Sequence, residues 1–204
     1  MFFSRRDVIL RVLLTSSISI CSYVGDQILK NGKNQALRAI SDNLTHAIVG
    51  GLSWSLIVIL SKKSLSQNIF RILSCFLVSS FVDLDHFIVA RSWKLHDATH
   101  LERRPFLHCS TLPIIIWLFL LSISIMYNLP NTNDYAWIIL AGFLSHHIRD
   151  ATRRGMWFCP IGSTKPIPYP IYLCTSMAFP YILAWLMYMV PGKTGEYSTM
   201  TFMV

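Results

Sequence analysis

The residues in this chain that are best suited to chemistry are histidines and aspartates placed three or four positions apart. Three such pairs occur: Asp42 with His46, Asp83 with His86, and His146 with Asp150. Residues at these spacings share one face of a helix, so each pair presents an imidazole and a carboxylate together. These two groups are protein ligands of zinc, iron and manganese, and a carboxylate can also fix the tautomer of a neighbouring imidazole. The pairs therefore predict a metal site.

The stretch SHHIRD at residues 145–150 contains two adjacent histidines, and they are not equivalent. On a helix, His147 is rotated by about 100° from His146. His146 shares a face with Asp150, so we expect His146 to point into the molecule and His147 to lie at its rim.

Arginines lie in and just after the same stretch, at positions 149, 153 and 154, and two more open the sequence RRPF at 103–106. Arg104 and Arg149 are predicted to bind an anionic group, such as phosphate, on a substrate, because a guanidinium recognises phosphate through paired hydrogen bonds. The alternative is that these arginines extend to the phosphates of the surrounding lipids.

The composition indicates a membrane protein. Only 14% of the 204 residues are charged and 53% are hydrophobic, whereas a soluble domain carries about a quarter charged residues. The net charge of +8 is typical of loops that face anionic lipid. No basic arm, zinc-finger spacing or RNA-binding motif occurs, so no nucleic-acid partner is expected. Membrane lipids are the expected partners, and protein partners are left open. The five cysteines include no CxxC, which argues against a disulfide framework.

Uncharged runs predict an all-α, polytopic helix bundle that forms one transmembrane domain over residues 1–204. Runs at 43–61, 105–133 and 166–192 are long enough to cross a bilayer, and three shorter runs alternate with them. About six transmembrane helices are therefore expected, near residues 8–28, 44–61, 67–89, 107–129, 135–153 and 170–190.

Alternating helix directions bring the ionisable residues to one side of the membrane. We call side X the side on which the helices near 8–28, 67–89 and 135–153 end. All seven histidines and seven of the ten acidic residues fall there, while the opposite side, side Y, keeps only Asp7, Asp134 and Glu196. Ionisable residues within membrane segments usually face the bundle interior and mark a site. Side X carries eleven Lys and Arg against seven on side Y, where both termini are expected, so the positive-inside rule places side X toward the cytosol.

Four stretches, in this order, resemble the motifs of a known family: THAIVGG (45–51), DLDH (83–86), RRPFLHCS (103–110) and GFLSHHIRDATRRGMWFCPIG (142–162). They are similar to motifs of the bacterial membrane-bound metal-dependent hydrolase family. They resemble still more closely those of the eukaryotic transmembrane protein 267 family, whose function is unassigned. The resemblance covers most of residues 26–170. Arg103 stands where the bacterial family has a histidine, and Pro105 where it has a glycine.

The resemblance implies a set of metal ligands at the matching positions. The predicted ligands are His46, Asp85, His86, His108, His146 and Asp150. Asp83 and Asp42 are predicted to act as general base or to orient a ligand. Zinc is the first choice of divalent ion, with manganese and iron as alternatives.

These features lead to one functional hypothesis and two alternatives. The first is a membrane-embedded hydrolase in which one or two divalent ions activate water to attack a lipid ester or phosphoester. The second is a non-catalytic multi-pass protein that keeps a structural metal or a polar cluster, and Arg103 at the position of a family histidine favours it. The third is metal or proton transport, but the helices near 44–61, 107–129 and 170–190 offer few polar residues toward side Y.

Overall fold

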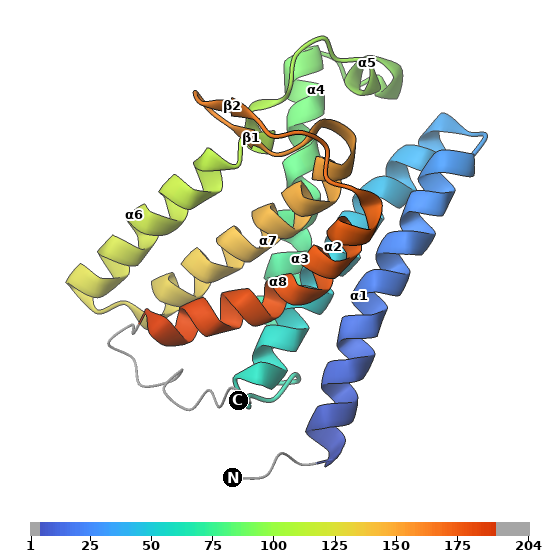
Figure 1. Ribbon diagram of the computed structural model, residues 1–204. Coiled ribbons are helices and arrows are strands. Elements are labelled where there is room, and N and C mark those ends of the chain that lie inside the picture. Colours follow the sequence, from blue (N-terminus) through green and yellow to red (C-terminus); the bar gives the residue numbers. More distant parts are fainter. Residues whose placement is uncertain (1–4, 191–204) are drawn as a thin grey trace.

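The computed structural model describes residues 5–190 and confirms the all-α fold class (Figure 1). In chain order the elements are α1 (Arg5–Asn31), α2 (Gln35–Leu60), α3 (Ile69–Phe81), the 3₁₀ turn η1 (Val82–Leu84), α4 (Asp85–Ala90), α5 (Leu95–Thr99), the 3₁₀ turn η2 (Phe106–His108), α6 (Thr111–Tyr127), α7 (Pro130–Arg154), the two-residue strands β1 (Trp157–Phe158) and β2 (Gly162–Ser163), and α8 (Tyr169–Met189). Glu196 and both chain termini, which were predicted on side Y, lie outside the described residues.

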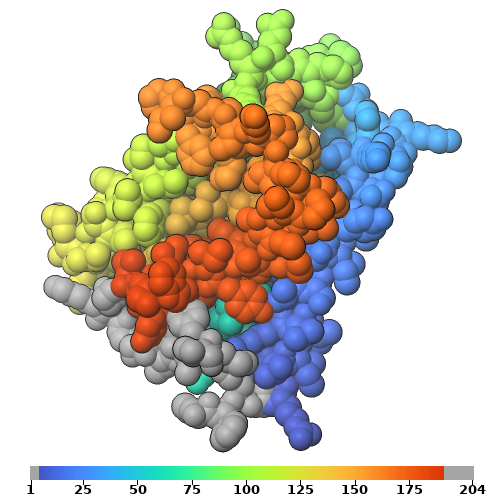
Figure 2. Space-filling view, viewed as in Figure 1, coloured from blue at the N-terminus to red at the C-terminus, as the bar shows by residue number. Residues whose placement is uncertain are grey.

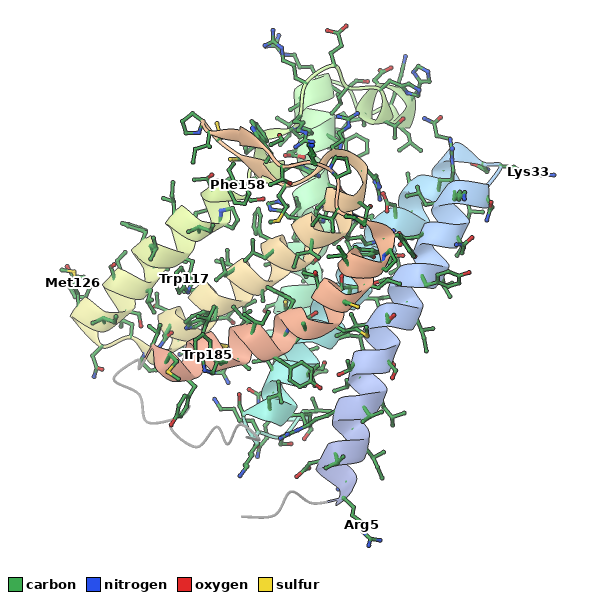
Figure 3. The ribbon with its side chains drawn as sticks, in the orientation of Figure 1. Arg5, Lys33, Trp117, Met126, Phe158 and Trp185 are labelled. Atoms are coloured by element: carbon green, nitrogen blue, oxygen red, sulfur yellow. The ribbon has the colours of Figure 1, made fainter. Side chains whose placement is uncertain are left out.

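The long helices alternate in direction as the sequence predicts. In Figure 1, α1, α7 and the continuous segment α3–η1–α4 run toward the upper end of the bundle, and α2, α6 and α8 run away from it. The upper end therefore corresponds to side X. Figure 3 labels Arg5 at the lower end of α1 and Lys33 just beyond its upper end.

Four helical segments are long and apolar enough to cross a membrane: Arg5–Asn31, Gln35–Leu60, Ile69–Ala90 and Tyr169–Met189. The apolar helix α6 is shorter, and α7 carries polar residues at both of its ends. Six helical segments therefore occupy the predicted positions, while the number of true membrane spans stays a prediction.

The helix boundaries on side X differ from those predicted. α2 begins at Gln35 rather than near 44, because Asn34 caps it by accepting the Ala36 N–H at 2.8 Å. The first turns of α2 contain charged residues, so a prediction based on uncharged runs places the start of this helix too late. The predicted helix near 67–89 changes to a 3₁₀ turn at η1, and the one near 107–129 begins only at Thr111. His108 therefore lies in η2, before the helix.

α7 is the central helix of the bundle, in contact with α2, α3, α6 and α8. Small residues allow this close packing: a Cβ at Gly142 would lie 2.6 Å from Val78 Cγ1 on α3. On the other side, the ring centroids of Trp117 on α6 and Trp137 lie 4.8 Å apart, and Figure 3 labels Trp117 between the two helices. α7 is thereby fixed from several directions, which gives its side-X end a defined position.

The side-X end of α7 is covered by the segment that follows it. Gly155 ends the helix with φ +69°, and a Cβ there would lie 2.0 Å from the Thr164 carbonyl oxygen, so this close approach requires glycine. The chain then returns through the β1–β2 hairpin, and the Ile167 N–H donates to the Ala151 carbonyl at 2.9 Å. Figure 2 shows this segment, in orange, lying over the end of α7.

Candidate metal centre

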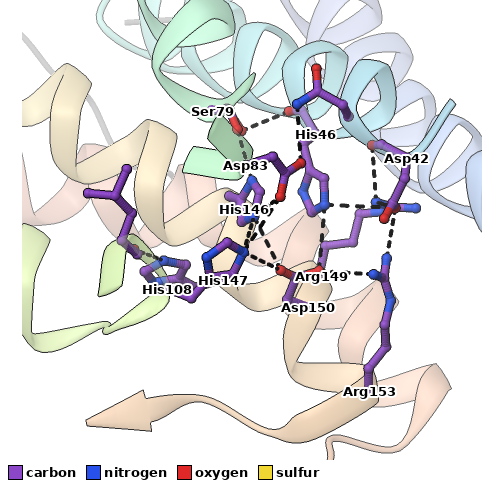
Figure 4. A network of polar contacts seen from close by, with 12 residues as sticks. Asp42, His46, Ser79, Asp83, His108, His146, His147, Arg149, Asp150 and Arg153 are labelled. Atoms are coloured by element: carbon purple, nitrogen blue, oxygen red, sulfur yellow. Dashed lines mark hydrogen bonds and ion pairs between the residues drawn. The ribbon is translucent and has the colours of Figure 1, made fainter. Parts of the chain in front are cut away.

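Four parts of the chain meet at the side-X end of the bundle and bring the predicted ligands together (Figure 4). The six predicted ligands are His46 from α2, Asp85 and His86 from α4, His108 from η2, and His146 and Asp150 from α7. With Asp83 from η1 they form three overlapping groups of three residues, and the potential ligand atoms within each group lie within 4.8 Å of one another. The arrangement is the convergence that the alternating helix directions predict.

Four of these residues, which we call the tetrad, bring two imidazole nitrogens and two carboxylate oxygens close together. The tetrad is Asp83, His108, His146 and Asp150. The Oδ1 atom of Asp83 lies 3.5 Å from each histidine Nε2, and Asp150 Oδ2 lies 3.3 and 3.2 Å from the same two atoms. The two Nε2 atoms are 3.3 Å apart. Ligands held about 2.0–2.1 Å from a tetrahedral ion are about 3.3–3.4 Å from each other, so either carboxylate, together with the two Nε2 atoms, has the spacing of three ligands of one ion.

The two tetrad histidines differ in what lies beside their other ring nitrogen. His146 Nδ1 donates to the carbonyl oxygen of Ser79 at 2.8 Å, and His108 Nδ1 lies 3.4 Å from Asp85 Oδ1. A proton on Nδ1 leaves the Nε2 lone pair free to bind a cation, which is the usual support for a metal-binding histidine. The His146 ring is therefore oriented as a ligand before any ion binds, whereas His108 Nδ1 has a carboxylate beside it but no hydrogen bond.

Asp85 lies on the opposite side of the His108 ring from the tetrad. It is fully buried, and its Oδ2 accepts the Leu107 N–H at 2.6 Å, which ties η2 to the start of α4. This geometry makes Asp85 an orienting residue for His108, whereas the sequence predicted it as a ligand. Asp85 Oδ1 also lies 3.4 Å from His86 Nδ1, so the group of Asp85, His86 and His108 keeps the spacing of a second potential site.

His46 extends the centre on the side of α2. Its ring stacks on His146 with centroids 3.7 Å apart, and it is 1% exposed. Neither of its ring nitrogens has a hydrogen-bond partner among the described residues, and the same is true of Asp150 Oδ1, 3.5 Å from His46 Nε2. Buried polar atoms without partners are costly. A cation at this second position, shared through Asp150, would satisfy both.

The charge of the centre also suits a cation. Five carboxylates meet here, from Asp26, Asp42, Asp83, Asp85 and Asp150, against two guanidiniums, from Arg149 and Arg153. Three negative charges therefore remain if the imidazoles are neutral. His108, in η2 outside the apolar spans, reflects this excess. Burial alone would lower its pKa, but the carboxylates of Asp150, Asp83 and Asp85 raise it to about 11.

Arg149 has a structural position that the sequence analysis did not predict. It is 1% exposed and donates to Asp26 Oδ1 on α1 at 2.8 Å and to Asp42 Oδ1 on α2. A guanidinium buried between two carboxylates reaches neither a substrate nor lipid phosphate, so neither predicted role fits. Arg153 donates to the same Asp42 oxygen at 2.7 Å. Because both arginines engage Asp42, its carboxylate is placed to orient its neighbours rather than to take a proton.

His147 is turned away from the tetrad, as expected, but it does not lie at the rim. It is 3% exposed. Its Nε2 donates to the Leu107 carbonyl at 3.0 Å, and its Nδ1 accepts from the Ser110 hydroxyl at 3.0 Å. These bonds fasten the segment around η2 to α7, and that segment carries His108. The correction follows from the hairpin and η2, which cover this face of α7.

Arg104 also holds the chain together. Its guanidinium donates to Ser163 Oγ at 3.1 Å, to the Gly155 carbonyl at 3.4 Å and to the carbonyl of Arg154. These contacts clamp the loop before η2 to the end of α7, and the substrate-binding role of Arg104 stays a prediction. Arg103 is exposed, and the tetrad is complete without it.

Two further contacts position the tetrad, and sequence reasoning missed both. Asn43 Nδ2 donates to Asp83 Oδ2 at 3.1 Å and to the Ser80 carbonyl at 2.8 Å, which joins α2 to η1. The Ser79 carbonyl that holds His146 is a backbone group, and no residue type could have revealed it. Asn43 offered a weak signal, because it stands beside Asp42 and one turn before His46.

A protein family and several known proteins match most of the chain. The YdjM inner membrane protein family matches residues 42–204, a range that contains every tetrad residue. Transmembrane protein 267 of Mus musculus is 40% identical over 160 residues, which are 76% of this chain and 72% of the mouse protein. The protein of the same name from Bos taurus is 38% identical over 157 residues, or 76% of this chain and 72% of its own. No solved structure matches the chain. This chain therefore belongs to the YdjM inner membrane protein family, with the transmembrane protein 267 group among its relatives.

Proposed function

We propose that the chain is a membrane-embedded, metal-dependent hydrolase that cleaves an ester or phosphoester. The observation that carries the proposal is the tetrad, in which each carboxylate lies 3.2–3.5 Å from two histidine Nε2 atoms that are 3.3 Å apart, the spacing of three ligands around one ion. Imidazole and carboxylate ligands suit zinc, and manganese or iron are the alternatives. The unpartnered atoms of His46 and Asp150 support a second ion beside the first.

The residues around the tetrad suit hydrolysis. A divalent ion bound there would lower the pKa of a water molecule and polarise an ester oxygen. His146 keeps its Nε2 lone pair directed at the centre because its Nδ1 atom is held by the Ser79 carbonyl, and His108 Nε2 lies 3.3 Å from it. Asp83 lines the cavity beside the centre, and one of its carboxylate oxygens accepts a hydrogen bond from Asn43. With His108, His146 and Asp150 as the ligands of the ion, Asp83 is the carboxylate best placed to accept the proton of an attacking water, while Asp42 is held by two arginines.

Metal analysis of the detergent-purified protein tests the first step. We expect about one to two equivalents of zinc, manganese or iron per chain, lost in His146→Ala and His108→Ala. His96→Ala is the matched control, because His96 is exposed and lies outside the centre. A parent protein without metal, or equal loss in the control, would overturn the proposal.

Turnover tests the second step. Metal-loaded protein should cleave a soluble ester or phosphoester, and Asp83→Asn should reduce kcat more than KM. Retained metal without any turnover would favour the alternative of a non-catalytic protein with a structural metal, for which Arg103 in place of the family histidine is the supporting observation.

A further inference from the structure

A large cavity lies directly beside the metal centre. Its volume is about 940 Å³, and α2, the segment α3–η1–α4, α5 and the end of α7 form its walls. Ligand-binding cavities have volumes of about 300–1,000 Å³, so this one accommodates a large molecule. Asp83, His86, His108 and Asp150 are among its lining residues, so three of the four tetrad residues border the cavity.

The mouth of the cavity carries apolar side chains that face outward. Ile40 and Leu44 on α2 are 66% and 48% exposed, and Phe81 and Leu84 on α3–η1 are 53% and 45% exposed. Phe81 and Leu84 belong to a longer stripe on the same segment, whose members are three or four residues apart: Phe70, Leu73, Leu77, Phe81, Leu84 and Ile88, all exposed. Such spacing forms one helix face. Because the segment Ile69–Ala90 is apolar enough to span a membrane, this face contacts lipid, and the cavity opens toward the lipid.

Two exposed arginines line the same cavity and form no ion pair with another described residue. Arg38 on α2 and Arg154 at the end of α7 are both exposed, and neither forms an ion pair with a carboxylate within residues 5–190. They differ in this from Arg149 and Arg153. A guanidinium binds phosphate strongly, and a neutral ester would leave both arginines with water alone.

We propose that the substrate is a phosphate ester of a membrane lipid, an inference that rests on the proposed function. The phosphate lies between the tetrad and the two free arginines, and the acyl chains leave through the mouth between α2 and α3–η1 into the bilayer. In the reaction, the oxygen of water forms a new bond to phosphorus and the bond from phosphorus to the lipid alcohol breaks. One proton from water ends on the leaving alcohol, so the products are that alcohol and a phosphate.

Photolabelling measures binding separately from turnover. The probe is a diacylglycerol phosphate with a diazirine on one acyl chain, added to the metal-loaded protein in neutral detergent micelles. We expect labelling of peptides from α2 and α3, competed by dioleoylglycerol phosphate but not by inorganic phosphate or dioleoylglycerol at the same concentration. Competition by dioleoylglycerol equal to that by its phosphate would overturn phosphate recognition, and equal competition by inorganic phosphate would overturn the lipid source.

Paired variants locate the binding. Leu44→Trp should block the mouth and remove most labelling, whereas Leu73→Trp, on the same lipid-facing surface but outside the cavity, should not. Ile40→Trp is a second blocking variant if the first does not fold. Equal labelling in Leu44→Trp, Ile40→Trp and Leu73→Trp would overturn the mouth assignment.

The arginines are tested in the same way. Replacing both Arg38 and Arg154 with Gln should weaken competition by dioleoylglycerol phosphate by about tenfold or more, since hydrogen bonds to charged groups are worth about 1.5–3 kcal/mol each. Arg103→Gln, an exposed arginine outside the cavity, should change it little. An equal effect in the control would overturn the assignment.

The two proposals fail in different ways. Binding of the lipid phosphate without its turnover supports this inference and counts against the hydrolase. Turnover of a soluble phosphoester without lipid binding supports the hydrolase and overturns the lipid substrate.

Discussion

Replacing Arg149 with Met should destabilise the protein strongly, although Arg149 is not a predicted metal ligand in the structure. The change keeps the volume of the side chain but removes both ion pairs. Asp26 and Asp42 would then lose a partner while only 20% and 17% exposed. Asp42 would keep Arg153, but Asp26 would keep only the Tyr169 hydroxyl, which donates to it at 3.1 Å.

The magnitude follows from this burial. Removing one partner of a buried ion pair costs about 3–5 kcal/mol in the free energy of unfolding. Because both carboxylates are partly exposed, we expect a loss of about 3 kcal/mol. For a chain of this size, 1 kcal/mol shifts Tm by about 2–4 °C, so Tm should fall by about 6–12 °C. Arg153→Met is the control, because Arg153 is 41% exposed and an exposed pair contributes at most about 1 kcal/mol.

Thermal unfolding in one detergent, at one protein concentration and one metal concentration, measures the difference. Adding Asp26→Asn to Arg149→Met should restore part of the loss, because the second change removes the stranded charge. The reasoning is refuted if Arg149→Met unfolds within about 2 °C of the parent, or no earlier than Arg153→Met.

Three further expectations follow from the geometry. Removing metal with a chelator should lower Tm and adding zinc should restore it, because an ion bound only by the folded protein stabilises it; an unchanged Tm on both treatments argues against a metal centre. His146→Ala should abolish metal binding, whereas His147→Ala should keep most of the metal but lower Tm, since His147 fastens η2 to α7; the reverse order in metal content would contradict the assignment. Gly142→Ala should cost about 1–3 kcal/mol in the free energy of unfolding, because the new Cβ would meet Val78, and Val78→Ala on that background should recover part of it.

The convergence of the histidines and aspartates could be predicted because it depends only on helix number and direction. Uncharged runs gave both, and three- and four-residue spacings paired His46 with Asp42 and His146 with Asp150. The fold class followed from the same runs. What they could not give is the rotation of each helix, which is set by packing contacts such as Gly142 on Val78.

The finer roles depended on contacts between distant segments. Asp85 orients His108 because the Leu107 N–H reaches it across 22 positions of the chain, and no local spacing encodes that bond. Arg149 was expected to reach outward, but α1 places Asp26 against it, 123 positions earlier. His147 was expected at the rim because the covering by η2 and the hairpin was not visible in the sequence.

The central position of α7 has a consequence for how the protein enters the membrane. Its polar ends make it less suited than α1, α2 or α8 to partition into a bilayer alone, yet it carries His146, Arg149 and Asp150. Among their partners are residues of α1, α2, η1 and η2, all of which are synthesised before α7. Insertion of α7 is therefore coupled to the presence of the preceding helices, and the centre is completed in the same event that commits α7 to the membrane. A chain from which α1 has been deleted should consequently leave α7 poorly inserted, which glycosylation mapping of the loop after Arg154 would detect.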